Sequence, residues 1–563
     1  MKLKPLDLID FYKVDHRRQY PAGTNKIYAN LTARSAKHSP WLKDNKTVFY
    51  GLQYFIKDYL IDLFNDEFFN LSVGELNDLL SEHKNMLDSS LGGDNGVFMF
   101  TMLHRLGHLP IEIKALPEGS RVDIGVPYLT ITNTHDDFFW LVNYIETLLS
   151  CVIWRPITSA TIAHHYRQLC LDASERTCDD TSHVNFQCHD FSFRGLSNPY
   201  DAALSGSAHL LSFMGSDTVP AIQLAKEYYD AEGVVAMSVP ATEHSVMCMG
   251  SKESELETFS RLITKLYPSG IVSVVSDTWD LWKVLTEYLP KLKEEVLARE
   301  GKLVIRPDSG DPADIICGET IEDFSKDCED IGEFRAWCKD TLLERLVDET
   351  GHGEWGGDEV VGKFKFEGKC YECVVDVRWN RFDKQFYFIE RSDSDIFMVE
   401  IALLPKSKGV VELLWDEFGG SINSKGYKVL DPHVGVIYGD SITMDRAVDI
   451  FQRLEEKGFA SSNIVFGVGS FTYQYQTRDT FGIAMKTTYG EIGAVPQTVF
   501  KDPITDGGIK RSAKGLLQVV KSGDDYVLNE EVSLEDSGCG ELRTVFKNGK
   551  VFNKVNYNDI RFL

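Results

Sequence analysis

The chain has 563 residues, and its 59 Lys and Arg against 85 Asp and Glu give a formal net charge of −26. At about 100–200 residues per domain, this length predicts more than one folding unit. Apolar residues at 43% and aromatic residues at 12% are enough to build large buried cores, which excludes general disorder. The acidity argues against a nucleic-acid binder that depends on counterion release, although a local basic cleft can still hold a small anionic substrate.

Targeting signals and cysteines indicate the compartment. The first 20 residues alternate charged and apolar side chains and contain no apolar core of a signal peptide. No window approaches the ~18–20 apolar residues of a membrane span. Eleven scattered cysteines are an odd number, which favours free thiols in a reducing compartment. We therefore expect a cytoplasmic protein with neither a membrane nor nucleic acid as its partner.

One cysteine pair has metal-ligand spacing, Cys370-Tyr371-Glu372-Cys373. It has no second pair at finger or ribbon spacing, so we expect free thiols in a small β-rich segment and keep a zinc site as the alternative. The other conceivable ligands lie upstream: Cys317, Cys328, Cys338 and His352.

The beginning of the chain predicts a mixed α/β unit. Apolar periodicity indicates a helix over Val48–Asn65, and strands are expected at Ile111–Ala115 and Tyr128–Thr132. Two more helices are expected over Trp140–Leu149 and Thr158–Ala173.

From about residue 185 the pattern changes to short β-branched strands that end in polar or glycine-rich loops. Near-continuous apolar strands alternating with helices imply a parallel sheet buried on both faces, with the active site at the carboxyl ends of the strands. The number of such strand ends favours a (β/α) barrel. Four are clear and the last two are weaker: Ser273–Asp277, Leu303–Gly310, Val434–Asp440, Asn463–Ser470, Gln187–Gly195 and Ala236–Ser245. Helices are expected after the first and third, over Trp279–Leu297 and Thr443–Lys457.

Residues 313–424 interrupt this pattern. They hold 26 acidic and 13 basic residues, a net charge of −13, and become β-like toward their end, as an inserted β-rich subdomain would. Asn548-Gly549 near the C-terminus is a strong two-residue hairpin signal. We expect five segments: an N-terminal mixed α/β domain at 1–150, the first part of the barrel at 151–312, the acidic insertion at 313–424, the second part of the barrel at 425–490, and a C-terminal segment at 491–563 that packs on the N-terminal domain.

Several strand ends carry residues suited to a phosphorylated sugar. Arg306 and Asp308 point the same way at a strand end, and they offer a phosphate fork and a partner for hydroxyls or a magnesium-bound water. A buried ion pair is the alternative for these two. The loop Gly467–Ser470 can cradle a phosphate with its amides, and Asp277 and the Gly439-Asp440 pair add carboxylates. Each of these strings alone is a weak signal. The interpretation as a phosphorylated-sugar site depends on their repetition at several strand ends.

Two further strings suit a planar ring and a reactive histidine. Phe191 can stack on a ring and Arg194 can meet an anion, although both also suit an ordinary core strand. His244 can accept a proton or a phosphoryl group, with Glu243 setting its tautomer or charge. A structural histidine is the alternative there.

The ordered set of strings resembles the nicotinamide phosphoribosyltransferases, which are type II phosphoribosyltransferases. The resemblance covers nearly the whole chain outside 313–424. It rests on strings that are weak singly and specific together: Asp10–Lys13, His189–Gly195, Gly215–Val219, Glu243–Ser245, Ser273–Asp277, Arg306–Gly310, Gly439-Asp440, Thr477–Asp479 and Lys501–Pro503.

The resemblance implies a homodimeric transferase with sites at the dimer interface. Its fold would be a distorted (β/α) barrel with a second α+β domain built from the N- and C-terminal parts. It would make nicotinamide mononucleotide and pyrophosphate from nicotinamide and phosphoribosyl pyrophosphate, with Mg²⁺. His244 matches the histidine that the family phosphorylates with ATP, which then stimulates turnover. The resemblance does not name the metal ligands.

The resemblance also implies the roles of the site residues. Phe191 and Tyr12 of the partner subunit would sandwich the nicotinamide ring, and Asp217 would accept a hydrogen bond from its amide. The ribose and its phosphates would be held by Arg306, Asp308, Gly439 and Asp440, and the 5′-phosphate by Gly469 and Ser470. The pyrophosphate would face Arg194, His244 and Arg306, helped by Arg34, Arg478 and Lys486 of the partner subunit. Ser273, Glu243 and Asp277 are matched as well, with Asp277 near the ribose or His244.

The sequence departs from the family at three positions and in one segment. Ser470 stands where the family usually has Gly, Phe193 replaces a usual Tyr, and Ala484 replaces a phosphate-contacting Ser. The segment 313–424 is longer than in the animal enzymes. Two alternative functions remain. The first is phosphoribosyl transfer to nicotinate, which the Asp217 carboxylate disfavours because it would repel the carboxylate of that substrate. The second is a non-catalytic binding protein, which would not need to retain Arg306 and His244.

Overall fold

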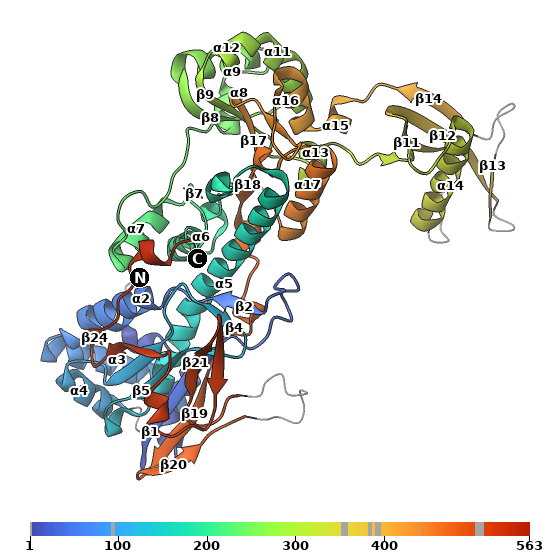
Figure 1. The fold of residues 1–563 in the computed structure, drawn as a ribbon. Helices are drawn as coiled ribbons and strands as arrows, with labels where there is room; N and C mark the ends of the chain where they lie inside the picture. The colour runs from blue at the N-terminus through green and yellow to red at the C-terminus, as the bar shows by residue number, and fades with distance from the viewer. Residues whose placement is uncertain are drawn as a thin grey trace. The chain divides into compact units, whose positions relative to one another are not determined.

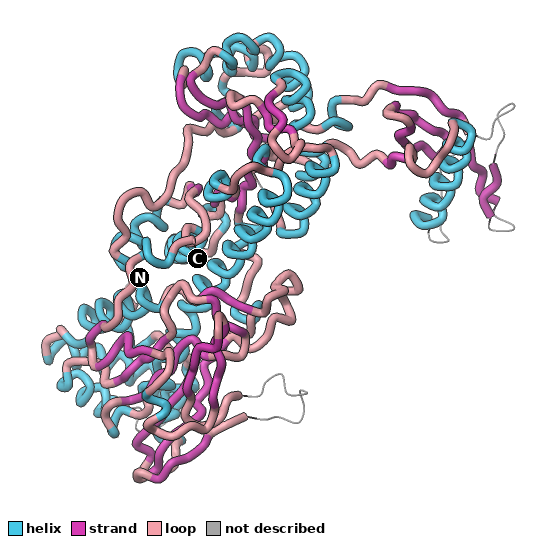
Figure 2. The backbone as a smooth tube through the Cα atoms, viewed as in Figure 1, coloured by secondary structure: helices cyan, strands magenta, loops and turns pink. Residues whose placement is uncertain are grey.

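The computed structural model describes residues 3–91, 96–350, 359–380, 385–388, 396–439, 441–501 and 512–562. The chain folds as two compact units. The first unit comprises Met1–Val239, Gly439–Val448 and Ile464–Leu563, and the second comprises Pro240–Tyr438 and Asp449–Asn463. Figures 1 and 2 show that both units combine helices with strands, so the α/β class predicted from the sequence is confirmed.

A seven-stranded antiparallel sheet joins the two ends of the chain in the first unit. Its order is β20-β19-β1-β5-β3-β23-β24, so N-terminal and C-terminal strands lie next to each other (Figure 1). The expected α+β domain built from both ends of the chain is therefore present. The strands are β1 (Thr24–Thr32), β3 (Ile111–Ala115), β5 (Pro127–Asn133), β19 (Ala484–Ile492), β20 (Val495–Thr498), β23 (Arg543–Lys547) and β24 (Lys550–Val551).

The C-terminal hairpin of this sheet forms as predicted. Asn548 and Gly549, which connect β23 to β24, have φ angles of 49° and 77°. Two consecutive positive φ angles are the geometry of a type I′ turn, which matches the twist of the flanking strands.

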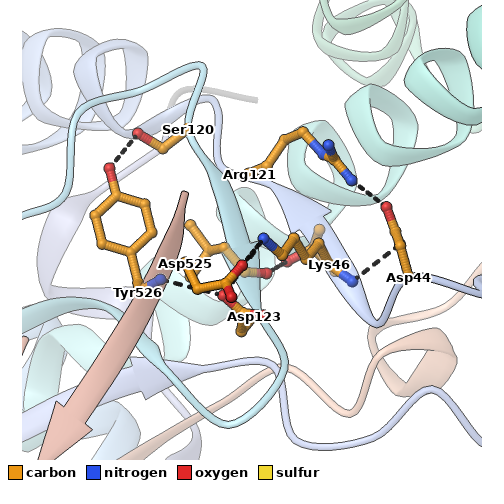
Figure 3. A network of polar contacts seen from close by, with 9 residues as sticks. Asp44, Lys46, Ser120, Arg121, Asp123, Asp525 and Tyr526 are labelled. Carbon is orange, nitrogen blue, oxygen red and sulfur yellow. Dashed lines mark hydrogen bonds and ion pairs between the residues drawn. The ribbon is translucent and has the colours of Figure 1, made fainter. Parts of the chain in front are cut away.

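A polar network fastens a second C-terminal hairpin, β21 (Gln518–Ser522) with β22 (Asp525–Asn529), to the N-terminal pair β2 (Lys46–Val48) and β4 (Arg121–Asp123) (Figure 3). Lys46 pairs with both Asp525 and Asp123, and the Tyr526 amide donates to the Asp123 carboxylate at 3.3 Å. The contacts of Asp525 and Tyr526 join residues 479 and 403 positions apart in sequence.

The longest helix is α5, over Leu141–Thr177, and it corrects the expectation of two separate helices. Pro156 lies inside it and does not end it. The pyrrolidine ring packs against Gly51, where an added Cβ would lie 2.4 Å from the ring. The other helices of this unit are α1 (His16–Gln19), α2 (Leu52–Phe55), α3 (Val73–Leu91), α4 (Val97–Leu106), α6 (Pro199–His209), α7 (Val219–Tyr229) and α18 (Ser470–Tyr473).

Each unit contains three parallel strands of the barrel type. In the first unit β6 (Cys188–Asp190) lies between β7 (Gly215–Ser216) and β18 (Ile464–Val468). In the second unit β9 (Glu300–Arg306) lies between β8 (Ser269–Val275) and β17 (Val434–Tyr438). β17 and most of β8 and β18 are buried, as continuous apolar strands predict.

Helices alternate with these strands in the second unit. Helix α17 (Met444–Glu456) spans the boundary between the two units. The others are α8 (His244–Met249), α9 (Glu255–Arg261), α10 (Leu281–Lys283), α11 (Leu289–Lys291), α12 (Lys293–Leu297), α13 (Pro312–Cys317), α15 (Pro405–Lys408) and α16 (Val410–Phe418).

The inserted segment forms the expected β-rich subdomain, which has a five-stranded sheet and its own hydrophobic core. Helix α14 (Ile331–Thr350), which the sequence interpretation missed, contributes Phe334, Cys338 and Leu342 to that core. Cys373 joins them, and all eleven cysteines of the chain are free thiols. The strands are β10 (Glu322–Asp323), β11 (Glu359–Phe366), β12 (Lys369–Asn380), β13 (Gln385–Phe388) and β14 (Phe397–Ile401), followed by the pair β15 (Gly420–Ile422) and β16 (Lys428–Leu430).

The described residues contain neither a helix that could span a membrane nor a cluster with the geometry of a metal site. None of their helices is long and apolar enough to cross a membrane. Among them no group of three or more His, Cys, Asp or Glu side chains has the geometry of a metal site, and His352 lies outside the described residues.

A buried carboxyl in the first unit predicts a pH dependence of stability. Glu118 accepts hydrogen bonds from the amides of Gly51 and Gln53 at 2.6 Å and from the Tyr229 hydroxyl at 2.9 Å. Burial nevertheless raises the pKa of Glu118 to about 7. Between the unfolded pKa of about 4.5 and 7 the folded state binds the extra proton, so stability decreases as pH rises through this window, by up to about 3 kcal/mol.

The measurement is the melting temperature as a function of pH for the wild type and for Glu118→Gln. The wild-type melting temperature is expected to fall more steeply between pH 4.5 and 7 than that of the variant. Parallel curves for the two proteins would contradict the assignment.

Candidate functional site

One cluster of predicted residues lies at the strand ends of the second unit. Asp277 follows β8, and its Oδ2 accepts hydrogen bonds from the Asp308 amide at 2.9 Å and from the Ser309 hydroxyl. The His244 Nε2 lies 4.0 Å from Asp277 and 3.8 Å from Asp308. Only 8% of the Asp277 side chain is exposed, against 46% for His244, so a buried carboxylate underlies an accessible imidazole.

The second ring nitrogen of His244, Nδ1, contacts a different side chain from the one expected. Nδ1 lies 3.2 Å from the Thr278 hydroxyl. The Glu243 carboxylate instead accepts a hydrogen bond from Ser245. Thr278 is thus the residue in contact with Nδ1, and it was not singled out from the sequence although it adjoins Asp277.

Arg306 is the last residue of β9, and Ser273 lies inside the neighbouring strand β8. The Arg306 Nη2 donates to the Thr242 carbonyl at 2.5 Å, which ties β9 to the residue just before Glu243. Ser273 is 3% exposed and exchanges backbone hydrogen bonds with Pro240 and Thr242. Its hydroxyl makes no hydrogen bond with the described part of the chain, which leaves a buried polar atom suited to a ligand.

A second cluster lies at the strand ends of the first unit. The His189 Nε2 is 3.0 Å from the Asp217 Oδ1, and the Ser238 hydroxyl donates to the same oxygen. The rings of His189 and Phe191 have centroids 4.6 Å apart. The structure therefore brings Phe191 and Asp217, which were both predicted site residues, into contact with the same histidine.

A fully buried carboxylate positions this second cluster. Asp190 accepts hydrogen bonds from the Ser192 amide at 2.9 Å and the Ser216 hydroxyl at 3.1 Å. The Asp217 amide donates to the Asp190 carbonyl at 3.0 Å. These bonds fix the ends of β6 and β7, from which Phe191 and Asp217 follow.

The predicted phosphate loop packs against the segment that carries Arg194. Gly469 caps the short helix α18, and Ser470 is its first residue. A Cβ added to Gly195 would lie 2.1 Å from the Cβ of Ser470. Arg194 itself is exposed beside this contact.

A third group of predicted residues shares one pocket of the first unit. Tyr12, which is 63% exposed, lines a cavity of about 370 Å³ together with Arg478 and Lys486. The buried Lys13 and the partly buried Glu146, 3.0 Å apart, line it too. Lys13 was not singled out as a site residue, although it belongs to the Asp10–Lys13 string.

The charges around this pocket affect one another. Burial lowers the pKa of Lys486. The nearby charges of Arg34 and Lys13 lower it further, whereas that of Glu146 raises it. Burial also lowers the pKa of Arg34, and Arg478 adds to the effect. Arg34 is fixed by donating from Nε to the Gly482 carbonyl at 2.9 Å. Such mutually repelling cations favour an anionic ligand.

The remaining predicted residues are Gly439 and Asp440. Gly439 directly follows β17, whose Tyr438 hydroxyl donates to the Gly310 carbonyl at 2.9 Å. Asp440 lies outside the described residues.

Two family models match the chain. The model of the nicotinate phosphoribosyltransferase family matches residues 186–336 and 373–550. The model described as the nicotinamide phosphoribosyltransferase N-terminal domain matches residues 6–113.

Curated relatives match over nearly the whole chain. The nicotinamide phosphoribosyltransferase of Acinetobacter baylyi is 47% identical, over 100% of this chain and 97% of its own length. That of Mycoplasma pneumoniae is 32% identical, over 90% of this chain and 93% of its own length. Among solved structures, human nicotinic acid phosphoribosyltransferase has a TM-score of 0.47 at 14% identity, covering 98% of this chain and 92% of that chain.

The contact between Gly195 and Ser470 predicts an unusual pair of variants. In Gly195→Ala the new methyl group overlaps Ser470, and relieving the overlap displaces the phosphate loop. We expect about tenfold weaker binding of ribose 5-phosphate, whose phosphate the family resemblance assigns to Gly469 and Ser470, by isothermal titration calorimetry. Gly195→Ala combined with Ser470→Gly removes the overlapping atoms and is expected to restore binding to within about threefold. Equal weakening in the single and double variants would contradict this account.

Proposed function

The chain belongs to the nicotinate phosphoribosyltransferase family, and from that premise we propose that it transfers phosphoribosyl from phosphoribosyl pyrophosphate to nicotinamide. It is an enzyme of the pentosyltransferase class, and its reaction makes nicotinamide mononucleotide and pyrophosphate for NAD salvage. The observation that carries the choice of nicotinamide is Asp217, an acceptor that contacts the same histidine, His189, as the Phe191 ring. A carboxylate accepts from a carboxamide N–H but repels the carboxylate of nicotinate.

The reaction needs positioning rather than covalent work by the protein. The pyridine nitrogen of nicotinamide attacks the anomeric carbon, the bond from that carbon to the pyrophosphate oxygen breaks, and pyrophosphate leaves. Positive charge develops on the sugar and negative charge on the leaving group. Arg194 and Arg306 are proposed to stabilise the pyrophosphate, and Asp308 to hold the ribose hydroxyls.

The donor set of the second unit is compatible with magnesium. Asp277 and Asp308 supply carboxylate oxygens, and the phosphates of the substrate would complete the oxygen ligands that Mg²⁺ prefers. When bound, the ion would neutralise part of the pyrophosphate charge.

A partner subunit is proposed to complete the site. The pocket that contains Tyr12, Arg478 and Lys486 shares no residue with the His189 cluster in the described part of the chain. A homodimer in which these residues face the ligand of the other subunit would bring the two together. We also propose a cytoplasmic location, which the eleven free thiols support.

The function is tested by pyrophosphate release. The purified chain, given phosphoribosyl pyrophosphate and Mg²⁺, is expected to release pyrophosphate in proportion to added nicotinamide, with mononucleotide formed in equal amount. No release with nicotinamide would refute the proposal.

The role of Asp217 predicts a change of selectivity. In Asp217→Asn the side chain can donate a hydrogen bond to a carboxylate, so the ratio of kcat/KM for nicotinamide to that for nicotinate is expected to fall at least about tenfold. Asp172→Asn, an exposed change on α5, is the matched control and should keep the wild-type ratio. An unaltered ratio in Asp217→Asn would count against the assignment.

The exposed imidazole of His244 is proposed to take the γ-phosphoryl group of ATP, forming a P–N bond as the bond to ADP breaks. His244→Ala should then show the same rate with and without ATP and incorporate no label from [γ-³²P]ATP. His183→Ala, in a separate turn of the first unit, is the control and should keep the stimulation. Full ATP stimulation in His244→Ala would overturn the phosphohistidine step alone.

A further inference from the structure

His189 occupies a position fixed by strand pairing. It is the middle residue of β6, paired with Gly215 of β7 on one side and Gly467 of β18 on the other. Its side chain is 12% exposed. The strand register therefore holds the imidazole at one place and leaves it little freedom.

The space for the ring exists because residue 215 is glycine. A Cβ added to Gly215 would lie 2.8 Å from the His189 Nδ1 and 3.3 Å from its Cγ. Phe191 packs on the ring from another side, at a centroid distance of 4.6 Å and an interplanar angle of 37°. The imidazole is thus confined by both the Gly215 backbone and the Phe191 ring.

The confined ring reaches one oxygen of Asp217. The Nε2 lies 3.0 Å from Oδ1, so Nε2 carries the proton when the carboxylate is ionised. The Ser238 hydroxyl donates to the same Oδ1. Ser238 is held in place because Met237 bridges to Gly215 and its carbonyl accepts from the Ser216 amide at 3.1 Å.

We propose that His189 is a positioning residue that, with Ser238, clamps Oδ1 of Asp217 and so sets the preference for a pyridine carboxamide over a pyridine carboxylate. This inference rests on the proposed function and deepens it. Two donors on one oxygen fix the plane of the carboxylate and the direction of its second oxygen. The same imidazole supports Phe191, so the ring platform and the amide acceptor are aligned through one side chain.

Two substitutions at position 189 separate the donor from the ring. His189→Leu keeps apolar volume and removes the N–H, whereas His189→Gln loses the ring but places an amide N–H near the position of Nε2. The readout is the ratio of kcat/KM for nicotinamide to that for nicotinate, with the KM for phosphoribosyl pyrophosphate measured alongside. We expect the ratio to fall about 10- to 100-fold in His189→Leu, mainly through the KM for nicotinamide, and to stay within about threefold of wild type in His189→Gln.

Ser238→Ala and the double variant test the shared oxygen. Ser238→Ala is expected to lower the ratio by a smaller factor. The combined loss in His189→Leu with Ser238→Ala should differ from the product of the single losses, because both groups act on Oδ1. His183→Leu, six residues away in the turn before β6, is the matched control and should leave the ratio unchanged.

The possible outcomes distinguish a failure of the His189 clamp from a failure of the proposed transferase function. A wild-type protein that forms no mononucleotide from nicotinamide would refute the proposed function. An active wild type with a folded His189→Leu of unaltered ratio would overturn the clamp, as would equal losses in His189→Leu and His189→Gln. If His189→Leu does not fold, an unchanged ratio in Ser238→Ala overturns the clamp, and a lowered ratio supports it.

Discussion

Parallel strand pairing is the constraint on which the candidate site depends. In the first unit Asp190 of β6 pairs with Ser216 of β7 and Val468 of β18, so Phe191, Asp217 and Gly469 follow at one edge. Because parallel strands end at the same edge of the sheet, strand pairing alone brings residues from distant parts of the sequence together at that edge.

The same constraint organises the second unit. Val275 of β8 pairs with Arg306 of β9, so Asp277 and Asp308 emerge from neighbouring strands. Asp277 then receives the Asp308 amide and lies under His244. A change of register by one residue would turn these side chains to the other face of the sheet.

Charge in this chain is distributed unevenly. The net charge of −26 describes the whole sequence, and half of it belongs to residues 313–424. Cations instead gather where an anion is expected, since Lys13, Arg478 and Lys486 line one pocket of the first unit. A global negative field is compatible with such a pocket because short-range contacts are stronger than screened distant charges.

Local patterns in the sequence predicted the regular elements well. The strand Ile111–Ala115 is observed with the predicted bounds, and the Asn548-Gly549 turn forms as its residue types require. The failures involve tertiary packing. Pro156 does not end α5, since it packs against Gly51, and α14 lies in an acidic segment whose apolar positions face a core that the sequence alone did not identify.

The site was predicted as a set of residues but not as a set of contacts. Asp217, His244 and Asp277 were named from ordered strings and from a family resemblance. Ser238 and Thr278 were not, because their roles follow from strand register and loop conformation. The close approach of Gly195 to Ser470 likewise joins positions some 275 residues apart, which no local pattern reveals.

The central claim is that Asp217, which contacts the same histidine as Phe191, selects nicotinamide. The most direct measurement is mononucleotide formation by the unmodified chain, with nicotinamide and nicotinate compared under the same concentrations of phosphoribosyl pyrophosphate, Mg²⁺ and ATP. The account predicts that kcat/KM for nicotinamide is at least about 100-fold higher, as for a hydrogen bond gained against a like-charge contact. Equal turnover of the two substrates, or a preference for nicotinate, would contradict it.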